Sequence, residues 1–155
     1  MNIETRNQIL SVVLGIIILV LAYWLYDSIV TPYQEVVEKE KMTERVRNRM
    51  STVRDVLVRY EATLGHFPPT EGGLDSVIHF VKTDSMLSAD IDSILVDSKG
   101  RYSVDSLIFS PRTGDRFQYT LNDTLRPPLY LLTDPNSDDL IGSLERTTMR
   151  NAPNW

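Results

Sequence analysis

The segment Asp-Pro-Asn-Ser-Asp-Asp at residues 134–139 contains the side chains best suited to holding a ligand. Asp134, Asn136, Asp138 and Asp139 place carboxylate and amide oxygens close together, and Ca²⁺ takes several such oxygens from a flexible loop. Their spacing is not that of an EF-hand. The simpler interpretation is a solvated turn ahead of Leu140, because Asp, Asn and Pro favour turns. Calcium is therefore a candidate cofactor, and the turn is the alternative that we favour.

Catalytic chemistry has little support in the sequence. His66 and His79 are the only histidines, and each is more simply interpreted as structural or exposed. No Gly-x-Ser-x-Gly turn occurs, and Gly72-Gly73 lacks the Lys-Ser/Thr pair that a phosphate-binding loop requires. Without cysteine, disulfides, thiolate zinc sites and cysteine nucleophiles are excluded. We predict that the chain is not an enzyme; a membrane-tethered hydrolase is the weakest alternative.

Length and charge limit the classes of protein to consider. A chain of 155 residues suffices for one small domain plus an anchor. Its formal net charge of -5 gives no indication of a nucleic-acid partner. We divide it into a tail and anchor at residues 1–30, a helical stalk at 31–65 and a small domain at 66–155.

Residues 9–26 read ILSVVLGIIILVLAYWLY and contain no charge. As a helix these eighteen residues cover about 27 Å, close to the ~30 Å hydrocarbon layer of a bilayer. Aromatic residues cluster at one end, where they favour the headgroup region: Tyr23, Trp24, Tyr26 and Tyr33. A cleaved signal peptide is the alternative, but the run is long and no small-x-small site follows it. We predict a transmembrane anchor represented by Ile9, Val12, Gly15, Ile16, Leu19 and Trp24.

Charges beside the anchor indicate its orientation. Arg6 and the terminal amine precede it, whereas residues 27–38 contain no Lys or Arg. Because positive charge favours the cytoplasmic side, the nearest residues place the N-terminus inside and the following domain outside. Lys39, Lys41 and Arg45 come next, so a wider window favours the opposite topology. We give the nearest residues more weight.

An amphipathic helix follows the anchor and ends near Gly65, a natural C-cap before Pro68-Pro69. Its apolar residues recur in steps of four and three, as on one helix face: Val46, Met50, Val53, Leu57, Tyr60 and Leu64. The other face carries charges spaced for pairs along the helix, including Glu38, Glu40, Glu44, Arg45, Arg47 and Arg49. The stripe predicts packing on the chain's own domain; a coiled coil with another chain is the alternative.

The remaining residues predict an α+β domain. Leu74, Val77, Ile78 and Val81 indicate a short helix, followed by a polar loop at 82–93. Strand-like runs then lie at residues 94–96, 102–109, 116–121 and 129–133, separated by Gly- and Pro-containing turns. Helices followed by strands are typical of an α+β fold, here with a small antiparallel β-meander.

Three motifs carry a resemblance to a known family. Residues 60–74 read YEATLGHFPPTEGGL, a helix end followed by a proline-rich turn; residues 110–119 read SPRTGDRFQY; and the sequence ends in Asn154-Trp155. With the anchor and stalk, they resemble the type IV pilin-like proteins, most closely the major pseudopilin of type II secretion. The first motif is the most specific of the three, because it resembles the family's turn, which reads Tyr-Pro-Thr-Thr-Glu-x-Gly-Leu.

The resemblance implies a non-enzymatic, single-pass subunit of an envelope secretion or pilus-like assembly. It implies a location in the inner (cytoplasmic) membrane, with the C-terminal domain periplasmic or extracellular. In the family, neighbouring N-terminal helices pack together, and Gly15 would allow close approach to other subunits or a second copy. Major pseudopilins also bind calcium in a loop near the C-terminus, although the spacing of residues 134–139 differs from that loop.

The N-terminal segment departs from the family pattern. Family members carry a leader ending in Gly, cut before an aromatic residue, with Glu at the fifth mature position among apolar residues. Here Glu4 lies in the polar tail NIETRNQ, ahead of the apolar run. We therefore expect an uncleaved, stationary subunit rather than a filament former. A bitopic membrane scaffold of the cell-division type, with a coiled-coil stalk, is the main alternative.

Overall fold

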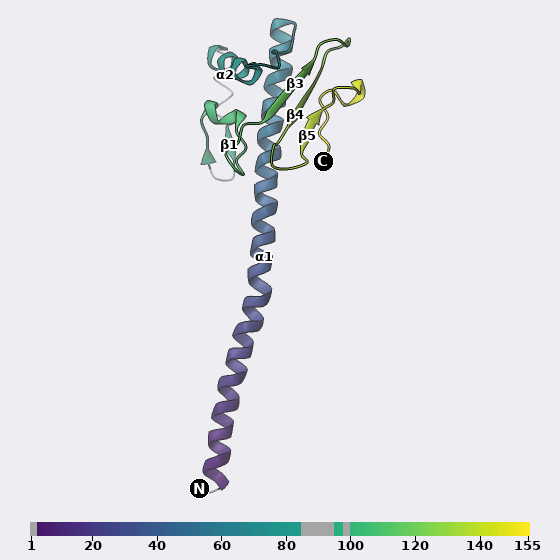
Figure 1. Cartoon of the computed structure of the whole chain (residues 1–155). Helices are drawn as coiled ribbons and strands as arrows, with labels where there is room; N and C mark the ends of the chain where they lie inside the picture. The colour runs from purple at the N-terminus through teal and green to yellow at the C-terminus, as the bar shows by residue number, and fades with distance from the viewer. Residues whose placement is uncertain (1–2, 85–94, 98–99) are drawn as a thin grey trace. The chain divides into compact units, whose positions relative to one another are not determined.

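A computed structural model describes residues 3–84, 95–97 and 100–155. The chain is α+β, with one long and one short helix followed by short strands (Figure 1). In chain order the elements are α1 (Ile3–Leu64), α2 (Gly73–Thr83), β1 (Val96–Asp97), β2 (Gly100–Arg101), the 3₁₀ helix η1 (Val104–Ile108), β3 (Gln118–Asn122), β4 (Leu129–Thr133), β5 (Leu140–Gly142) and the 3₁₀ helix η2 (Thr147–Met149).

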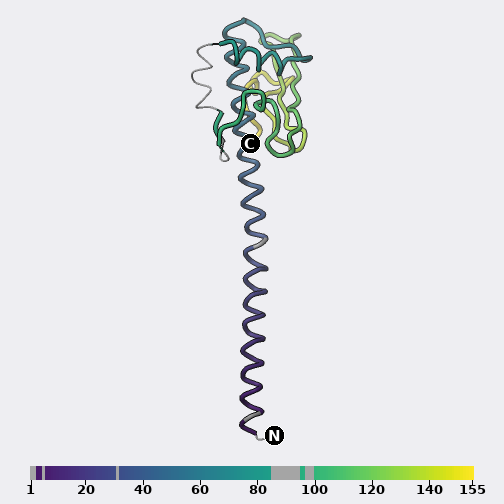
Figure 2. The backbone as a smooth tube through the Cα atoms, turned by 90° about the vertical axis from the view of Figure 1, so that its left-hand side faces the viewer, coloured from purple at the N-terminus to yellow at the C-terminus, as the bar shows by residue number. Residues whose placement is uncertain are grey.

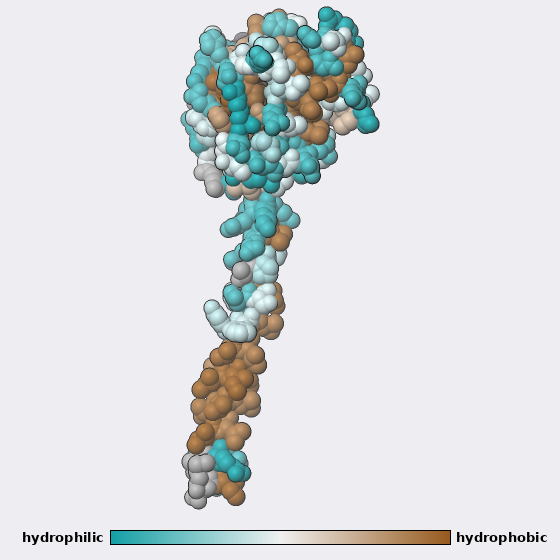
Figure 3. Space-filling view, viewed as in Figure 1, coloured by the Kyte–Doolittle hydropathy of each residue, from teal (hydrophilic) through white to brown (hydrophobic). Residues whose placement is uncertain are grey.

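Two compact units divide the chain, at Met1–Lys41 and Met42–Trp155. The first unit is the N-terminal part of α1, and Figure 3 shows hydrophobic side chains gathered along it. The second unit contains the rest of α1 and all other elements. Helix α1 continues through Pro32, although proline donates no backbone hydrogen bond, so the predicted anchor and stalk form one helix.

The C-terminal end of α1 has the local chemistry that the sequence predicts. Gly65 has a φ of 80°, which a residue with a Cβ rarely adopts, and its N–H donates to the Glu61 carbonyl at 2.8 Å. Pro68 and Pro69 follow, so the chain leaves the helix axis here. The prediction of a C-cap at Gly65 is confirmed.

The core of the second unit forms on the predicted stripe of α1. Val46, Met50, Val53 and Leu57 are fully buried, and Tyr60 is 8% exposed. They pack with residues of α2, η1, the sheet and the segment before β3, including Val77, Leu107, Phe117, Tyr130, Leu132 and Ile141. The views in Figure 1 and Figure 2 both place this part of α1 alongside the remaining elements of the unit. Packing on the chain's own domain is thus confirmed, but Leu64 is 47% exposed and does not continue the stripe.

The sheet of the second unit is antiparallel, with strand order β3-β4-β5. Its register aligns Tyr119 with Leu132 and Leu132 with Ile141. All three side chains are buried, as expected for directly opposed residues on one face of a sheet. This row forms the sheet's contribution to the core.

The middle of the chain contains the predicted short helix but not the predicted strand. The short helix is confirmed as α2, with Leu74, Val77, Ile78 and Val81 buried. The strand predicted at residues 102–109 is wrong, because Val104–Ile108 forms η1. The Ser106 N–H donates to the Ser103 carbonyl at 3.0 Å, and the two serine hydroxyls lie 2.8 Å apart. These serines favour a local turn over a strand ladder.

The predicted strand at residues 94–96 and loop at 82–93 fall partly outside the described residues. Val96 begins β1, which pairs with β2 in an antiparallel ladder. Lys82 and Thr83 close α2 instead of starting the loop. Further along, the predicted strands at 116–121 and 129–133 correspond to β3 and β4. Strand β5 was not predicted, since three residues are too few to show a period.

Candidate functional site

The predicted anchor residues are all exposed on α1. Ile9, Val12, Ile16, Leu19 and Trp24 are each more than half exposed. No side chain in residues 9–26 is buried, so apolar groups face outward all around the helix. Soluble monomers rarely expose so large an apolar surface. This part of α1 is long and apolar enough to cross a membrane.

The C-terminal boundary of the apolar run carries polar and aromatic groups. Tyr23, Trp24 and Tyr26 are exposed just before Asp27, the first charged residue after Arg6. Tyr33 is also exposed, two turns further along. Amphipathic rings favour the interface between hydrocarbon and water, so these four aromatic side chains are placed as expected for the end of a membrane span.

The acidic segment at residues 134–139 forms the loop between β4 and β5. The Asp134 N–H donates to the Asp139 carbonyl at 3.1 Å, which closes the loop. Both aspartate side chains are buried, and the Ser137 hydroxyl donates to Asp134 Oδ2 at 2.8 Å. Asp138 is exposed, and its backbone carbonyl accepts a hydrogen bond from the Asn154 side chain at 2.7 Å.

The Asn136 side chain binds residues of the turn before β3 rather than the two buried aspartates. Its Nδ2 donates to Asp115 Oδ2 at 2.8 Å and to Thr113 Oγ1 at 2.7 Å. The hydrogen bond from Asn136, followed by one involving Thr113, lowers the pKa of the Asp115 carboxyl below its ordinary value. Asn136 therefore ties the β4–β5 loop to the turn before β3.

Arg47 on α1 supplies the positive charge beside Asp139. Its Nε and Nη2 atoms lie 3.0 and 2.9 Å from Asp139 Oδ1. Arg49, two residues further along α1 and on a different side of the helix, is buried; it donates to the Ser106 and Phe109 carbonyls and lies over the Tyr102 ring. The sequence predicted that Arg47 and Arg49 pair with charges along α1. In the contacts described here, both side chains instead bind residues from other parts of the domain.

The four predicted calcium ligands do not converge on one point. Asp139 already binds a guanidinium, Asn136 turns its amide nitrogen toward Asp115, and Asp138 is exposed. Asp134 Oδ1 is buried without a hydrogen-bond partner, and it is the one feature that a cation would suit. Across residues 3–84, 95–97 and 100–155, no three His, Cys, Asp or Glu side chains are grouped to hold a metal ion.

The C-terminal residues contact β5 and Arg47, next to the β4–β5 loop. The Gly142 N–H donates to the Ala152 carbonyl at 3.0 Å, and the Asn154 N–H donates to the Leu140 carbonyl at 3.1 Å. The tail therefore pairs with the edge of β5. The Trp155 ring centroid lies 5.2 Å from Arg47 Cζ. Sequence reasoning used Asn154-Trp155 only as a family motif and missed its contact with Arg47.

No family model, curated protein or solved structure matches the chain.

A groove of about 610 Å³ lies between the end of α1 and the β3–β4 hairpin, and it contains one of the two histidines. His66 Nδ1 is 3.0 Å from the Phe67 carbonyl, which favours a structural role. The Glu61 carboxylate in the same groove is paired with Arg150. His79 lies on α2 and is exposed. Among the residues that the structure describes, His66 and His79 line separate hollows.

Proposed function

We propose that this chain is a non-enzymatic, single-pass membrane subunit of an envelope secretion or pilus-like assembly, with a pseudopilin-like domain. One observation carries the proposal: in the same helix, residues 9–26 expose only uncharged, mostly apolar side chains, whereas Val46, Met50, Val53 and Leu57 form a domain core. The first part would be inserted in the inner membrane. The domain would lie on the periplasmic or extracellular side, where it meets other subunits.

The composition of the anchor supports membrane insertion on energetic grounds. Leu, Ile and Val supply twelve of the eighteen residues at 9–26. At roughly 0.3 to 0.6 kcal/mol each near the bilayer centre, they favour insertion by about 4 to 7 kcal/mol. The nearest charges, Arg6 and Asp27, lie outside the run.

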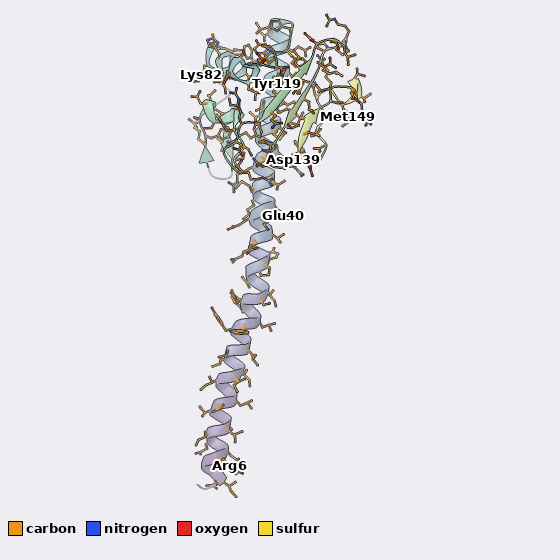
Figure 4. All side chains as sticks on the ribbon, viewed as in Figure 1. Arg6, Glu40, Lys82, Tyr119, Asp139 and Met149 are labelled. Carbon is orange, nitrogen blue, oxygen red and sulfur yellow. The ribbon has the colours of Figure 1, made fainter. Side chains whose placement is uncertain are left out.

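Contacts between the family-like motifs support the proposal that the domain is pseudopilin-like. The proline-rich turn and the β3 motif meet directly, because the Tyr119 hydroxyl donates to the Pro68 carbonyl at 3.0 Å. Phe67 from the same turn is buried with its ring 5.0 Å from that of Tyr130. Figure 4 labels Tyr119 on the sheet beside the terminal part of α1. Motifs far apart in sequence thus stabilise one turn.

The coiled-coil scaffold has weaker support. That alternative required Val46, Met50, Val53 and Leu57 to face a second chain, but these side chains are fully buried within the domain. A parallel dimer through them would expose the rest of the core. The scaffold would need another surface of the chain for self-association.

Association inside the membrane provides a test of the proposed assembly role. No atom lies within 4 Å of a Cβ built at Gly15, so a neighbouring helix could approach there. Gly15→Ile should lower the yield of crosslinks and of co-purified membrane subunits from detergent extracts. Val13→Ile is the control, because two residues correspond to roughly 200° around the helix. Intact crosslinks in Gly15→Ile would remove this contact, and a wild-type chain purified only as an isolated monomer would contradict the assembly role.

A further inference from the structure

The β4–β5 loop carries buried negative charge that needs compensation. Asp134 and Asp139 are 2% and 7% exposed, and no lysine or arginine occurs within the loop itself. A buried carboxylate is costly unless a cation or several donors accompany it. Within the loop, the Ser137 hydroxyl is a neutral donor that lies 2.8 Å from Asp134 Oδ2 and 3.3 Å from Asp139 Oδ2.

The cation comes from a helix 92 residues away in sequence. Both Nε and Nη2 of Arg47 donate to Asp139 Oδ1, and the side chain of Asp139 is only 9% exposed. Figure 4 labels Asp139 beside the ribbon of α1. The guanidinium thus supplies the positive charge that this buried carboxylate needs.

The C-terminal residues hold the arginine from the other side. Trp155 lies against the Arg47 guanidinium, a favourable cation–π arrangement. Asn154 bridges the loop and β5, accepting from the Leu140 N–H at 3.0 Å and donating to the Asp138 carbonyl. Helix, loop and tail are therefore joined through one guanidinium.

We propose that Arg47 takes the place of a metal ion in this loop, so that the domain is stable without calcium. The resemblance to major pseudopilins implies calcium here, and the contacts of Arg47, Asn136 and Asp139 disagree with that implication. The arginine ties the loop to α1, and the Trp155 ring lies against the guanidinium. The inference concerns the domain's stability and holds whether or not the chain belongs to a secretion assembly.

Thermal unfolding of the full chain in detergent micelles tests the metal part directly. A Trp24→Phe background leaves Trp155 as the one tryptophan, so its fluorescence reports the loop and tail. Excess calcium and excess EDTA should give the same transition temperature. A calcium-dependent rise of several degrees would overturn the proposal, and Asp134 Oδ1 would then be the first ligand to examine.

Substitution of the arginine tests the other part. Arg47→Ala should lower the transition temperature by on the order of 5 °C or more and shift Trp155 emission to longer wavelength. Arg54→Ala is the matched control, because Arg54 pairs with the adjacent Asp55 on the same helix. Equal losses in the two variants would contradict a special role for Arg47.

A double variant keeps the test valid if Arg47→Ala fails to fold. Asp139→Asn removes the charge that needs compensation, so Arg47→Ala combined with Asp139→Asn should lose less stability than the two single losses added together. A folded double variant beside an unfolded Arg47→Ala would support the proposal. Strictly additive losses would overturn it.

Discussion

The Tyr119 hydroxyl donates a hydrogen bond to the Pro68 carbonyl oxygen, 3.0 Å away and 51 residues earlier in sequence. The Tyr119 ring also lies against Gly73, where an added Cβ would be 3.1 Å from the ring. One side chain of β3 therefore fixes both sides of the turn that joins α1 to α2. The close approach of the Tyr119 ring explains why position 73 is a residue without a side chain.

Tyr119→Phe should destabilise the domain by about 1 to 3 kcal/mol, because it leaves a buried carbonyl without a donor. Chemical denaturation of the full chain in detergent measures the change. Tyr33→Phe is the control, since Tyr33 is 69% exposed outside the domain. Similar free energies of unfolding for both variants would show that the hydrogen bond contributes little.

Alkaline pH should unfold the domain through its buried tyrosines. Burial raises the pKa of Tyr119 and of Tyr130 above the ordinary value of about 10. The unfolded chain then loses these protons first, so the stability present below pH 10 is lost as pH rises toward the higher folded-state values. Absorbance near 295 nm, followed together with circular dichroism, should show late ionisation that coincides with unfolding. Ionisation of all seven tyrosines before any structural change would contradict this.

Leu57→Ala should cost about 2 to 5 kcal/mol, because it leaves a cavity at a fully buried position. Leu64→Ala on the same helix should change stability by only about 0.5 kcal/mol, since Leu64 is largely exposed. The loss for Leu57→Ala should not depend on protein concentration. A concentration-dependent loss would instead indicate that the stripe meets a second chain.

Gly142→Ala should be more damaging than Gly114→Ala. Both glycines have positive φ, at 88° and 80°, so each substitution carries the strain of a left-handed backbone, about 1 to 3 kcal/mol. At Gly142 the new Cβ would also lie 2.2 Å from the Tyr130 carbonyl oxygen, whereas at Gly114 nothing lies within 4 Å. Denaturation midpoints measure the difference. Equal midpoints would show that the backbone of β5 shifts to accommodate the new Cβ at little cost.

Local patterns in the sequence predicted the elements that depend on local chemistry. The run at residues 9–26, the stripe from Val46 to Tyr60 and the cap at Gly65 each follow from residue spacing or backbone preference. Strands β3 and β4 were also predicted. These features need no knowledge of distant partners.

Long-range contacts set the features that sequence reasoning missed. Residues 102–109 contain several residues typical of strands, but Ser103 and Ser106 favour a 3₁₀ turn, and burial of Leu107 and Ile108 stabilises it. Strand β5 depends on pairing with β4 and with the C-terminal tail. Nothing local indicated that Arg47 would meet Asp139, because charged residues on a helix usually face solvent.

The proposed anchor depends on an uninterrupted apolar surface, which two charges would interrupt. Ile16→Arg combined with Leu19→Arg places both charges near the middle of the run, at a cost of roughly 2.5 to 3.5 kcal/mol each. The double variant should lose membrane association while the domain core stays unchanged. Ile16→Leu combined with Leu19→Ile is the matched apolar control.

Flotation of the full chain with lipid vesicles tests the central claim most directly. After synthesis with vesicles and a wash at alkaline pH, the wild-type chain should rise with the lipid in a density gradient, and the double-arginine variant should stay at the bottom. Wild-type protein that stays in the soluble fraction without detergent would contradict the account.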